Sequence, residues 1–421
     1  MIHRHIMSAV LESLKDTPVA LLQGSRQTGK STLAEQIVEQ RKQGQYVTLD
    51  NQNILVGAHD DPTGFLHNLV AQVSPTELTV LDEIQRVPEL LLAIKAEVDR
   101  TRRPGRFLLT GSANILLLPK IADSLAGRIE LHTLWPLSQG EIDGIQERFI
   151  DAVFAKTFPV NHPTFPLCTD LLQRICQGGY PEIHARPSAA RQRAWFEAYI
   201  TTMLQRDIRD LANIEGLTAL PRVLALLATR AAGLTNYSEL SRSLAIPLST
   251  LKRYIGLLEQ AFLIHQLPPW SGNLGKRLVK TSKLFFNDTG LLAYVLGMDT
   301  KRLAQNHNHI GPLLENFVVT ELQKQRAWSR TPTTLFHFRT HTGQEVDVVI
   351  EDNQGRLVGI EVKAGATISP QDFKGLRALA DSVGDRFHHG LVLYTGQSVV
   401  PLGSNLSAIP VTGLWSLGAK G

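Results

Sequence analysis

The chain has 421 residues, 43% of them hydrophobic and 19% charged, which is enough apolar material for two or three domains and excludes a disordered chain. Its formal net charge of +4 is small, so binding to a polyanion would need local basic patches. Two cysteines are too few for a disulfide scaffold, and the start of the chain lacks the apolar core of a signal peptide. No apolar stretch is long enough to cross a membrane. We therefore expect a cytoplasmic protein without a membrane partner.

The first chemical motif lies in residues 18–40, where an apolar strand runs through a glycine-bearing loop into a helical pattern. The loop has the spacing GxxxxGKS, which is typical of a P-loop whose backbone amides wrap phosphates. Lys30 would neutralise phosphate charge, and Ser31 would bind Mg²⁺ at the start of the helix. We predict that ATP and Mg²⁺ are the cofactors. The residues expected to contact them are Gly24, Ser25, Arg26, Gln27, Thr28, Gly29, Lys30, Ser31 and Thr32.

Two further apolar strands end in polar residues. The strand before residue 82 ends in Asp82 and Glu83, of which Asp82 would hold Mg²⁺ and Glu83 would orient or deprotonate the attacking water. The strand in residues 106–112 ends in small polar residues, where Ser112 or Asn114 would sense the γ-phosphate. These carboxylates could serve as surface charge alone, but parallel strands would bring them to the same sheet edge as the loop.

Arg128 lies between a helical pattern and a further strand. This order is similar to that of AAA-type ATPases, in which an arginine before the last core strand reaches the nucleotide of the neighbouring subunit. We therefore predict that Arg128 is an arginine finger, whereas the alternative is a cation at a helix end. The turn in residues 178–182, GGYPE, would either touch adenine or serve only as a turn.

Residues 236–270 predict two helices, a short turn between them and a following strand, which is a helix-turn-helix of the winged kind. In the second helix Leu251, Tyr254 and Leu258 would face inward, with Thr250, Lys252 and Arg253 outward. The basic run after it would contact phosphates as a wing and contains Lys276, Arg277, Lys280 and Lys283. We predict DNA contacts at Lys252, Arg253, Lys276 and Arg277. The alternative is a protein-interaction or lid module.

A second set of charged residues lies near the end of the chain. Glu345 and Asp347 alternate on one strand, a turn over residues 352–355 reverses the chain, and Glu361 and Lys363 alternate on the next strand. Asp347 and Glu361 would bind Mg²⁺, and Lys363 would position water, as metal-assisted phosphodiester cleavage requires. Glu315 lies on a preceding helix. The alternatives are a solvated hairpin or a nuclease-like fold that has lost cleavage.

The whole chain resembles one bacterial and archaeal family of AAA-type P-loop ATPases. The resemblance lies in GSRQTGKSTL, VLDEIQRVPEL, LTGSANILLL, LAGRIELHTLWPLS, GGYPE, KLFFNDTGLLAYVLG, GPLLENFVVTEL and GQEVDVVIE with GIEVKAG. The family has a C-terminal domain of unknown function that is similar to PD-(D/E)xK nucleases. Here Val346 stands where the proline of that motif name would precede the aspartate.

The expected fold is α/β, with four parts. These are a P-loop AAA-type core with a parallel sheet flanked by helices (1–140), a helical lid (141–215), a winged-helix region (216–300) and a restriction-endonuclease-like α/β domain (301–421). We expect a DNA-binding ATPase, a hexameric ring that remodels duplex or branched DNA such as a Holliday junction. The C-terminal domain would either cleave DNA with the help of a metal ion or have lost that activity. The alternative is an ATP-controlled assembly or defence switch whose nuclease-like domain only binds partners or DNA.

Overall fold

The computed structural model describes the chain except residues 1, 42–43, 75, 113–126, 156–164, 166–167, 209–216, 274, 276, 278–280 and 420–421. The chain divides into two compact units. The N-terminal unit comprises His3–Pro136 and Gln260–Phe262, and the C-terminal unit comprises Met1–Ile2, Leu137–Glu259 and Leu263–Gly421. The boundary after Pro136 lies close to residue 140, where we predict the end of the ATPase core.

A five-stranded parallel sheet forms the centre of the N-terminal unit, in the order β2-β3-β4-β1-β5. The strands are β1 (Val19–Gln23), β2 (Gly44–Thr48), β3 (Leu78–Asp82), β4 (Phe107–Gly111) and β5 (Ile129–Thr133). Every residue of β1, β3 and β4 is buried, as expected for apolar strands covered on both faces. The predicted N-terminal parallel sheet is therefore confirmed.

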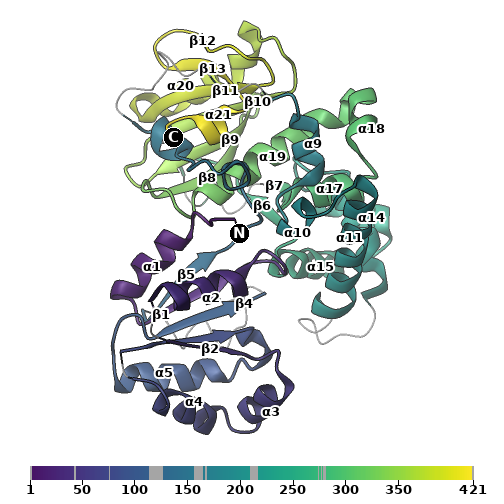
Figure 1. Ribbon diagram of the computed structural model, residues 1–421. Coiled ribbons are helices and arrows are strands. Elements are labelled where there is room, and N and C mark those ends of the chain that lie inside the picture. Colours follow the sequence, from purple (N-terminus) through teal and green to yellow (C-terminus); the bar gives the residue numbers. More distant parts are fainter. Residues whose placement is uncertain are drawn as a thin grey trace. The chain divides into compact units, whose positions relative to one another are not determined.

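Helices cover the faces of this sheet (Figure 1). They are α1 (Met7–Asp16), α2 (Lys30–Arg41), α3 (Gln52–Asp60), α4 (Pro62–Ala71) and α5 (Leu90–Arg100). Leu21, Leu81 and Leu109 share one hydrophobic core with residues of α3, α4 and α5. α1 contacts β1, and α2 contacts β2, β3 and β4. In parallel α/β sheets ligands bind at the carboxyl ends of the strands, which here end in Gln23, Asp82 and Gly111.

Helices form most of the first part of the C-terminal unit. They are α7 (Gln139–Asp143), α8 (Phe149–Val153), α9 (Leu171–Gln177), α10 (Pro181–His184), α11 (Ala189–Thr202), α13 (Leu220–Ala228), α14 (Tyr237–Leu244), α15 (Leu248–Gln260), α17 (Thr289–Val295), α18 (Thr300–Gln305) and α19 (Ile310–Gln325). The antiparallel pair β6 (Ile264–Leu267) and β7 (Lys283–Phe286) follows α15. In α15, Leu251, Tyr254 and Leu258 are buried while Lys252 and Arg253 are exposed. The predicted inward face is confirmed, as are Lys252 and Arg253 of the outward face, whereas Thr250, also predicted outward, is half-buried.

A six-stranded mixed sheet completes the C-terminal unit, in the order β12-β13-β11-β10-β9-β8. Its strands are β8 (Thr333–Arg339), β9 (Glu345–Asp352), β10 (Leu357–Lys363), β11 (Phe387–Tyr394), β12 (Val400–Pro401) and β13 (Leu406–Pro410). β9 and β10 form the predicted antiparallel hairpin, whose turn is closed by a 3.0 Å hydrogen bond from Gly355 N to Asp352 O. α20 (Lys374–Val383) packs on this sheet through Leu376 and Leu379. The short helix α21 (Gly413–Ser416) follows β13.

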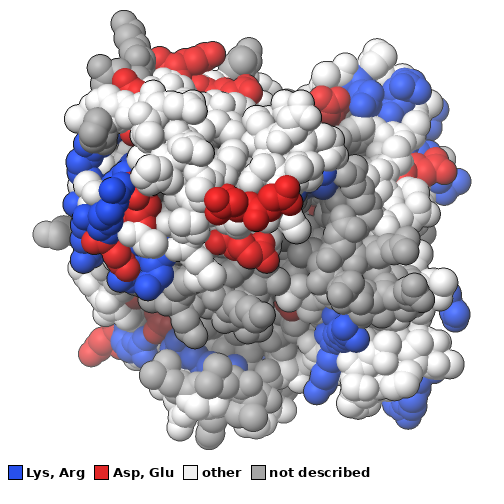
Figure 2. Space-filling model, turned by 90° about the horizontal axis from the view of Figure 1, so that it is seen from below, with Lys and Arg blue, Asp and Glu red and all other residues white. Residues whose placement is uncertain are grey.

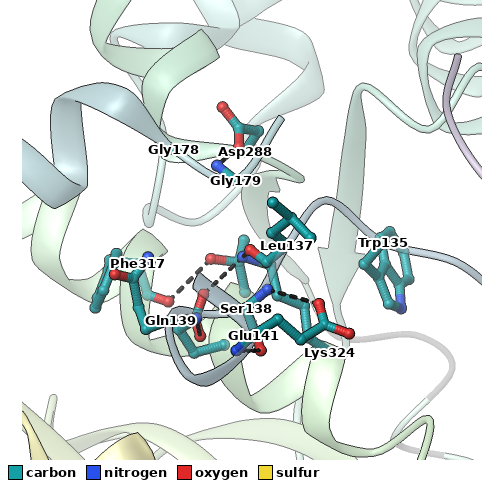
Figure 3. A network of polar contacts seen from close by, with 12 residues as sticks. Trp135, Leu137, Ser138, Gln139, Glu141, Gly178, Gly179, Asp288, Phe317 and Lys324 are labelled. Atoms are coloured by element: carbon teal, nitrogen blue, oxygen red, sulfur yellow. Dashed lines mark hydrogen bonds and ion pairs between the residues drawn. The ribbon is translucent and has the colours of Figure 1, made fainter. Parts of the chain in front are cut away.

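A buried polar network links segments of the C-terminal unit that lie far apart in the sequence (Figure 3). Lys324 Nζ of α19 donates to Leu137 O at 2.9 Å, and Gly179 N donates to Asp288 Oδ2 at 2.7 Å. Leu137 N donates to Gly179 O at 2.6 Å. Gly178 lies against Asp288, since a Cβ on it would come within 2.3 Å of that carboxylate. These contacts support the interpretation of the 178–182 segment as a structural turn.

The described surface carries both signs of charge. Figure 2 shows several separate groups of Lys and Arg side chains, and groups of Asp and Glu side chains, among the described residues. Among the residues that the structure describes, none of the helices combines the length and the apolar character needed to span a membrane.

Candidate functional site

The loop after β1 has the backbone conformation of a phosphate cradle. Gly24 has φ +149°, and a Cβ on it would lie 2.2 Å from Leu134 O. Gly29 has φ +93°, and Gln27 also has a positive φ of 61°. Glycine is needed at position 24 because an L side chain there would meet both backbone strain and a steric clash. The loop therefore turns tightly between β1 and α2 and presents backbone groups at the carboxyl edge of the sheet.

Lys30 is buried beneath this loop, with 4% of its surface exposed. Its Nζ donates to Gly24 O at 3.0 Å and to Ser25 O at 2.8 Å. Thr28 Oγ1 also donates to Ser25 O, at 2.9 Å, and Arg4 Nη1 donates to Thr28 O at 2.6 Å. The ammonium group is thus held against the loop that a phosphate would enter. Of the other residues predicted to contact the nucleotide, Arg26 is half-buried in the loop and Thr32 is exposed in the first turn of α2.

Asp82 at the end of β3 accepts hydrogen bonds from three hydroxyl groups. Ser31 Oγ donates to its two carboxylate oxygens at 3.0 and 3.1 Å, and Tyr46 donates to Oδ2 at 2.7 Å. Thr110 of β4 also donates to Asp82. Burial and the Asp82 carboxylate raise the pKa of Tyr46 above its ordinary value. The predicted pair Ser31 and Asp82 is therefore in direct contact, and oxygen ligands in this arrangement suit Mg²⁺.

Glu83 follows in a left-handed conformation, with φ 60° and ψ 43°. Its backbone N donates to Thr110 Oγ1 at 3.1 Å, which fixes the turn after β3. Gln85 donates to the Glu83 carboxylate and, at 2.8 Å, to Ser112 Oγ. The predicted water-activating residue and the predicted γ-phosphate sensor are thus joined through one amide side chain. Asn114, the other sensor candidate, lies outside the described residues.

Four residues of this site were not predicted from the sequence: Arg4, Tyr46, Gln85 and Thr110. Tyr46 and Thr110 lie on strands next to β3, on either side of it in the sheet. Their roles depend on which strands are neighbours, and the order of motifs alone does not give that. Gln85 follows Glu83 by two residues in VLDEIQR, so its closeness in the sequence to the predicted residues Asp82 and Glu83 could have indicated it as a member of the site.

Arg128 lies at the amino end of β5, on the sheet edge opposite to the loop that follows the carboxyl end of parallel β1. Its Nε donates to Asp99 Oδ1 of α5 at 2.5 Å. This hydrogen bond lowers the pKa of Asp99 below its ordinary value. Arg128 therefore cannot serve the nucleotide loop of its own sheet without crossing the sheet, and only a role toward another subunit or a structural role fits its position.

The C-terminal carboxylates come together across the hairpin of β9 and β10. Asp347 Oδ2 accepts from the backbone N of Val362 at 3.0 Å, and Lys363 Nζ lies 3.1 Å from Glu361 Oε1. Burial, and secondarily the charge of Asp347, raise the pKa of Glu361 to about 8. The three predicted residues of the nuclease-like site therefore lie close together on one side of the hairpin.

Lys283 requires a correction, because we predict it to contact phosphate as part of a basic wing. It begins β7, and its side chain is only 3% exposed. Its Nζ lies 2.8 Å from Glu315 Oε1, 2.5 Å from Glu345 Oε1 and 3.1 Å from Asp347 Oδ1. The buried ammonium is stabilised by these three carboxylates, which makes the inward position more favourable than exposure to solvent.

Arg277 also requires a correction as a predicted DNA contact. Its Nη1 lies 2.7 Å from Glu351 Oε2, with 14% of either side chain exposed, and its guanidinium lies over the rings of Trp270 and Phe336. An arginine held on three sides in this way is not displayed to a ligand. Lys276 lies outside the described residues, and Lys252 and Arg253 remain exposed on α15.

Comparison with known proteins places this chain in a family. Proteins of Mycobacterium bovis and Mycobacterium tuberculosis, both described as uncharacterized, are each 31% identical to it over 417 residues, which cover 99% of this chain and 85% of each relative. The chain belongs to the family of these mycobacterial proteins. A protein of Haemophilus influenzae, also described as uncharacterized, is 26% identical over 350 residues, covering 77% of this chain and 79% of the relative.

Family models match three segments of the chain. Residues 16–143 match the AAA domain, and residues 168–302 and 310–414 match two domains of unknown function, DUF8612 and DUF4143. Among solved structures, AMPPCP-bound DnaA from Aquifex aeolicus matches 60% of this chain and 86% of that chain, at 14% identity and a TM-score of 0.29. The AAA match and the parallel sheet show an AAA-type ATPase domain at the N-terminal end, as we predict.

Proposed function

We propose that this chain binds ATP with Mg²⁺ in its N-terminal unit and hydrolyses it to ADP and phosphate. The observation that carries the proposal is the meeting of four side chains at one edge of the sheet: Lys30, Ser31, Asp82 and Glu83. Lys30 comes from the cradle, and Ser31 contacts Asp82. A cation, a metal-binding oxygen pair and an adjacent carboxylate are what phosphoryl transfer to water needs.

The loop residues fit a nucleotide on the evidence of their backbone. Gly24 and Gly29, with positive φ angles, allow the amides of residues 24–32 to converge, and Lys30 would balance phosphate charge. Ser31 and Asp82 would hold Mg²⁺, which when bound supplies charge neutralisation on the phosphate oxygens. Glu83 would hold the attacking water, and Gln85 fixes its carboxylate relative to Ser112.

Two substitutions separate nucleotide binding from hydrolysis. Lys30→Ala should weaken binding of a fluorescent ATP analogue at least tenfold and abolish turnover, since the phosphate charge loses its partner. Glu83→Gln should keep the affinity and reduce phosphate release by about two orders of magnitude or more, because it changes only the handling of water. Hydrolysis at the wild-type rate in either variant would contradict the assignment. Glu39→Gln, at an exposed position near the other end of α2, is the matched control.

We further propose that ATP turnover drives engagement or remodelling of duplex or branched DNA by a hexameric ring. The elements α14, α15, β6 and β7 have the order of a winged helix, and α15 exposes Lys252 and Arg253. The order of α19, β8, β9, β10, α20 and β11, with Asp347 and Glu361 on the β9–β10 hairpin, supports the predicted nuclease-like core. The position of Arg128 at the far edge of the sheet supports an arginine finger acting between subunits.

The second candidate is an ATP-controlled switch in which the nuclease-like domain only binds partners or DNA. It is favoured by the ion pairs of Lys283, which occupy the C-terminal carboxylates. A gel-shift panel of single-stranded, duplex and four-way junction DNA, with and without ATP, separates the two candidates when combined with phosphate-release assays. Stimulation of hydrolysis by DNA supports the motor. Hydrolysis that no DNA changes supports the switch.

A further inference from the structure

The C-terminal carboxylate cluster raises the question of which cation balances it. Four acidic side chains converge there from three elements: Glu315 of α19, Glu345 and Asp347 of β9, and Glu361 of β10. A nuclease-like site of this kind would hold Mg²⁺ between such carboxylates. The fit of a metal can be judged from the contacts that these oxygens already make.

The contacts show that one protein cation, Lys283, already pairs with three of these four carboxylates. Lys283 Nζ lies within 3.1 Å of oxygens of Glu315, Glu345 and Asp347, at 2.8, 2.5 and 3.1 Å. The second oxygen of Asp347 accepts from Val362 N. A divalent cation bound through Asp347 Oδ1, whether it bridged to Glu361 or to Glu315, would share this oxygen with the ammonium group 3.1 Å away, and the two positive charges would repel strongly in this buried place. No group of three or more potential ligands suited to a metal is found in the described part of the chain.

Lys283 is also fixed from outside the cluster. It is the first residue of β7, where it pairs with Leu267 of β6, and it forms a further bridge with Leu234. With 3% of the side chain exposed, the ammonium cannot leave the cluster for solvent without movement of that strand. Burial of an unpaired ammonium would cost several kcal/mol, so the carboxylates and the lysine hold one another in place.

We propose that the Lys283 ammonium takes the place of the divalent cation, so that the nuclease-like cluster holds no Mg²⁺ or Mn²⁺ and performs no metal-dependent cleavage. The metal site that we predict at Asp347 and Glu361 is latent, and it opens when Lys283 is replaced by a neutral residue. This inference concerns the C-terminal unit and stands independently of ATP hydrolysis, so failure of either proposal leaves the other intact.

Mn²⁺ binding to the full chain without nucleotide tests the proposal, with free Mn²⁺ measured by electron paramagnetic resonance. Wild type and the Asp347→Asn variant should give the same Mn²⁺ binding isotherm, because the side chain at position 347 binds no metal in either protein. Lys283→Met should gain one site of at least tenfold higher affinity, and Lys283→Met with Asp347→Asn should lose it again. Mn²⁺ binding at Ser31 and Asp82 is the same in all four proteins, so it does not contribute to the differences between their isotherms.

Two outcomes would overturn the proposal. The first is a wild-type site that disappears in Asp347→Asn, or a Mn²⁺-dependent nick on junction or flap DNA that disappears in Asp347→Ala. The second is a Lys283→Met protein with a native circular dichroism spectrum that gains no site. If Lys283→Met does not fold, the comparison of wild type with Asp347→Asn still decides, since it needs no change at the lysine.

Discussion

The hydroxyl of Tyr46 donates a 2.7 Å hydrogen bond to Oδ2 of Asp82, from the strand next to the one that ends in this aspartate. Ser31 and Thr110 donate to the same carboxylate. Asp82 is therefore oriented from both neighbouring strands and from the start of α2. A carboxylate fixed in this way holds a metal ion with less loss of conformational freedom than one that must first be ordered.

Tyr46→Phe tests the contribution of this hydroxyl to metal binding. We expect the Mg²⁺ concentration for half-maximal hydrolysis to rise about fivefold, which corresponds to the loss of one hydrogen bond of about 1 kcal/mol. Binding of the ATP analogue without Mg²⁺ should not change. In an Asp82→Asn background the same substitution should have little further effect, and an unchanged Mg²⁺ dependence in the single variant would argue against the role.

Arg128→Ala should lower hydrolysis by about three orders of magnitude and leave ATP affinity nearly unchanged, because an arginine finger acts mainly in the transition state. The matched control is Asp99→Ala, which removes the partner of Arg128 in its own subunit. If the arginine serves only to bind Asp99, both substitutions should have the same effect. If it acts between subunits, Asp99→Ala should keep most activity.

Mixed assemblies give a second measurement on Arg128. Rings formed from Arg128→Ala and Lys30→Ala subunits should regain some hydrolysis, since an intact arginine can then face an intact loop. Assemblies shown to contain both subunits but lacking any recovery would count against action between subunits.

The sequence predicted the ATPase core well because its signals are local. The spacing from Gly24 to Ser31 predicts a loop, and the strand before Asp82 is apolar except for Thr79, which indicates a buried strand. Parallel strands then place both at one edge. Tyr46 and Thr110 could not be assigned in this way, because their contacts depend on the order β2-β3-β4 in the sheet.

The basic residues after α15 show where local patterns fail. Lys283 and Arg277 lie in a run of positive charge that resembles a solvated, phosphate-binding face. Their partners Glu315 and Glu351 are 32 and 74 residues away in the sequence. Burial of those carboxylates in the tertiary fold makes the ion pairs more favourable than exposure of the cations, and no short-range pattern carries that information.

DNA binding should depend on the exposed basic residues of α15. Lys252→Ala combined with Arg253→Ala should weaken binding to all DNA sequences about tenfold. The slope of the logarithm of the binding constant against the logarithm of the salt concentration should also become less steep, because about two fewer counterions are released. Arg277→Ala should leave the salt dependence unchanged but lower the free energy of unfolding by about 2 kcal/mol, because Glu351 loses one of its two arginine partners and keeps Arg386. Fluorescence anisotropy at several salt concentrations measures the first effect and urea unfolding the second. If Arg277→Ala reduces the salt dependence of DNA binding and the double variant of α15 does not, the DNA contact surface lies at Arg277.

Two glycines of the C-terminal unit should respond to alanine with opposite signs. A Cβ on Gly179 would lie 2.2 Å from Leu137 O, so Gly179→Ala should lower the free energy of unfolding by about 3 kcal/mol. Gly256 lies within α15, and a Cβ there meets nothing within 4 Å. Gly256→Ala should therefore stabilise by about 0.5–1 kcal/mol through helix propensity. Urea unfolding checks both, and a stable Gly179→Ala protein would show that the 178–182 turn is not tightly held.

Buried histidines should make the C-terminal unit lose stability in mild acid. His265 of β6 is half-buried and stacks on Phe285, and its Nδ1 lies 2.5 Å from Asn287 Oδ1. Burial lowers the pKa of His265 to about 4, and likewise those of His337 and His389. In the unfolded chain a histidine has a pKa of about 6.5, so between these values the unfolded state binds more protons than the folded state. Stability must then decrease as the pH falls from about 6.5 toward 4.

The contribution of His265 to this loss can be isolated by substitution. Between pH 7 and pH 5 each such histidine should remove about 2 kcal/mol from the free energy of unfolding. His265→Gln keeps a side-chain donor for Asn287 but cannot take up a proton in this range, so the variant should lose about 2 kcal/mol less than wild type over the same interval. Urea unfolding at the two pH values measures this difference, and carboxylates shared by both proteins cancel from it. An equal loss in wild type and His265→Gln would mean that His265 becomes protonated in the folded chain as readily as in the unfolded one.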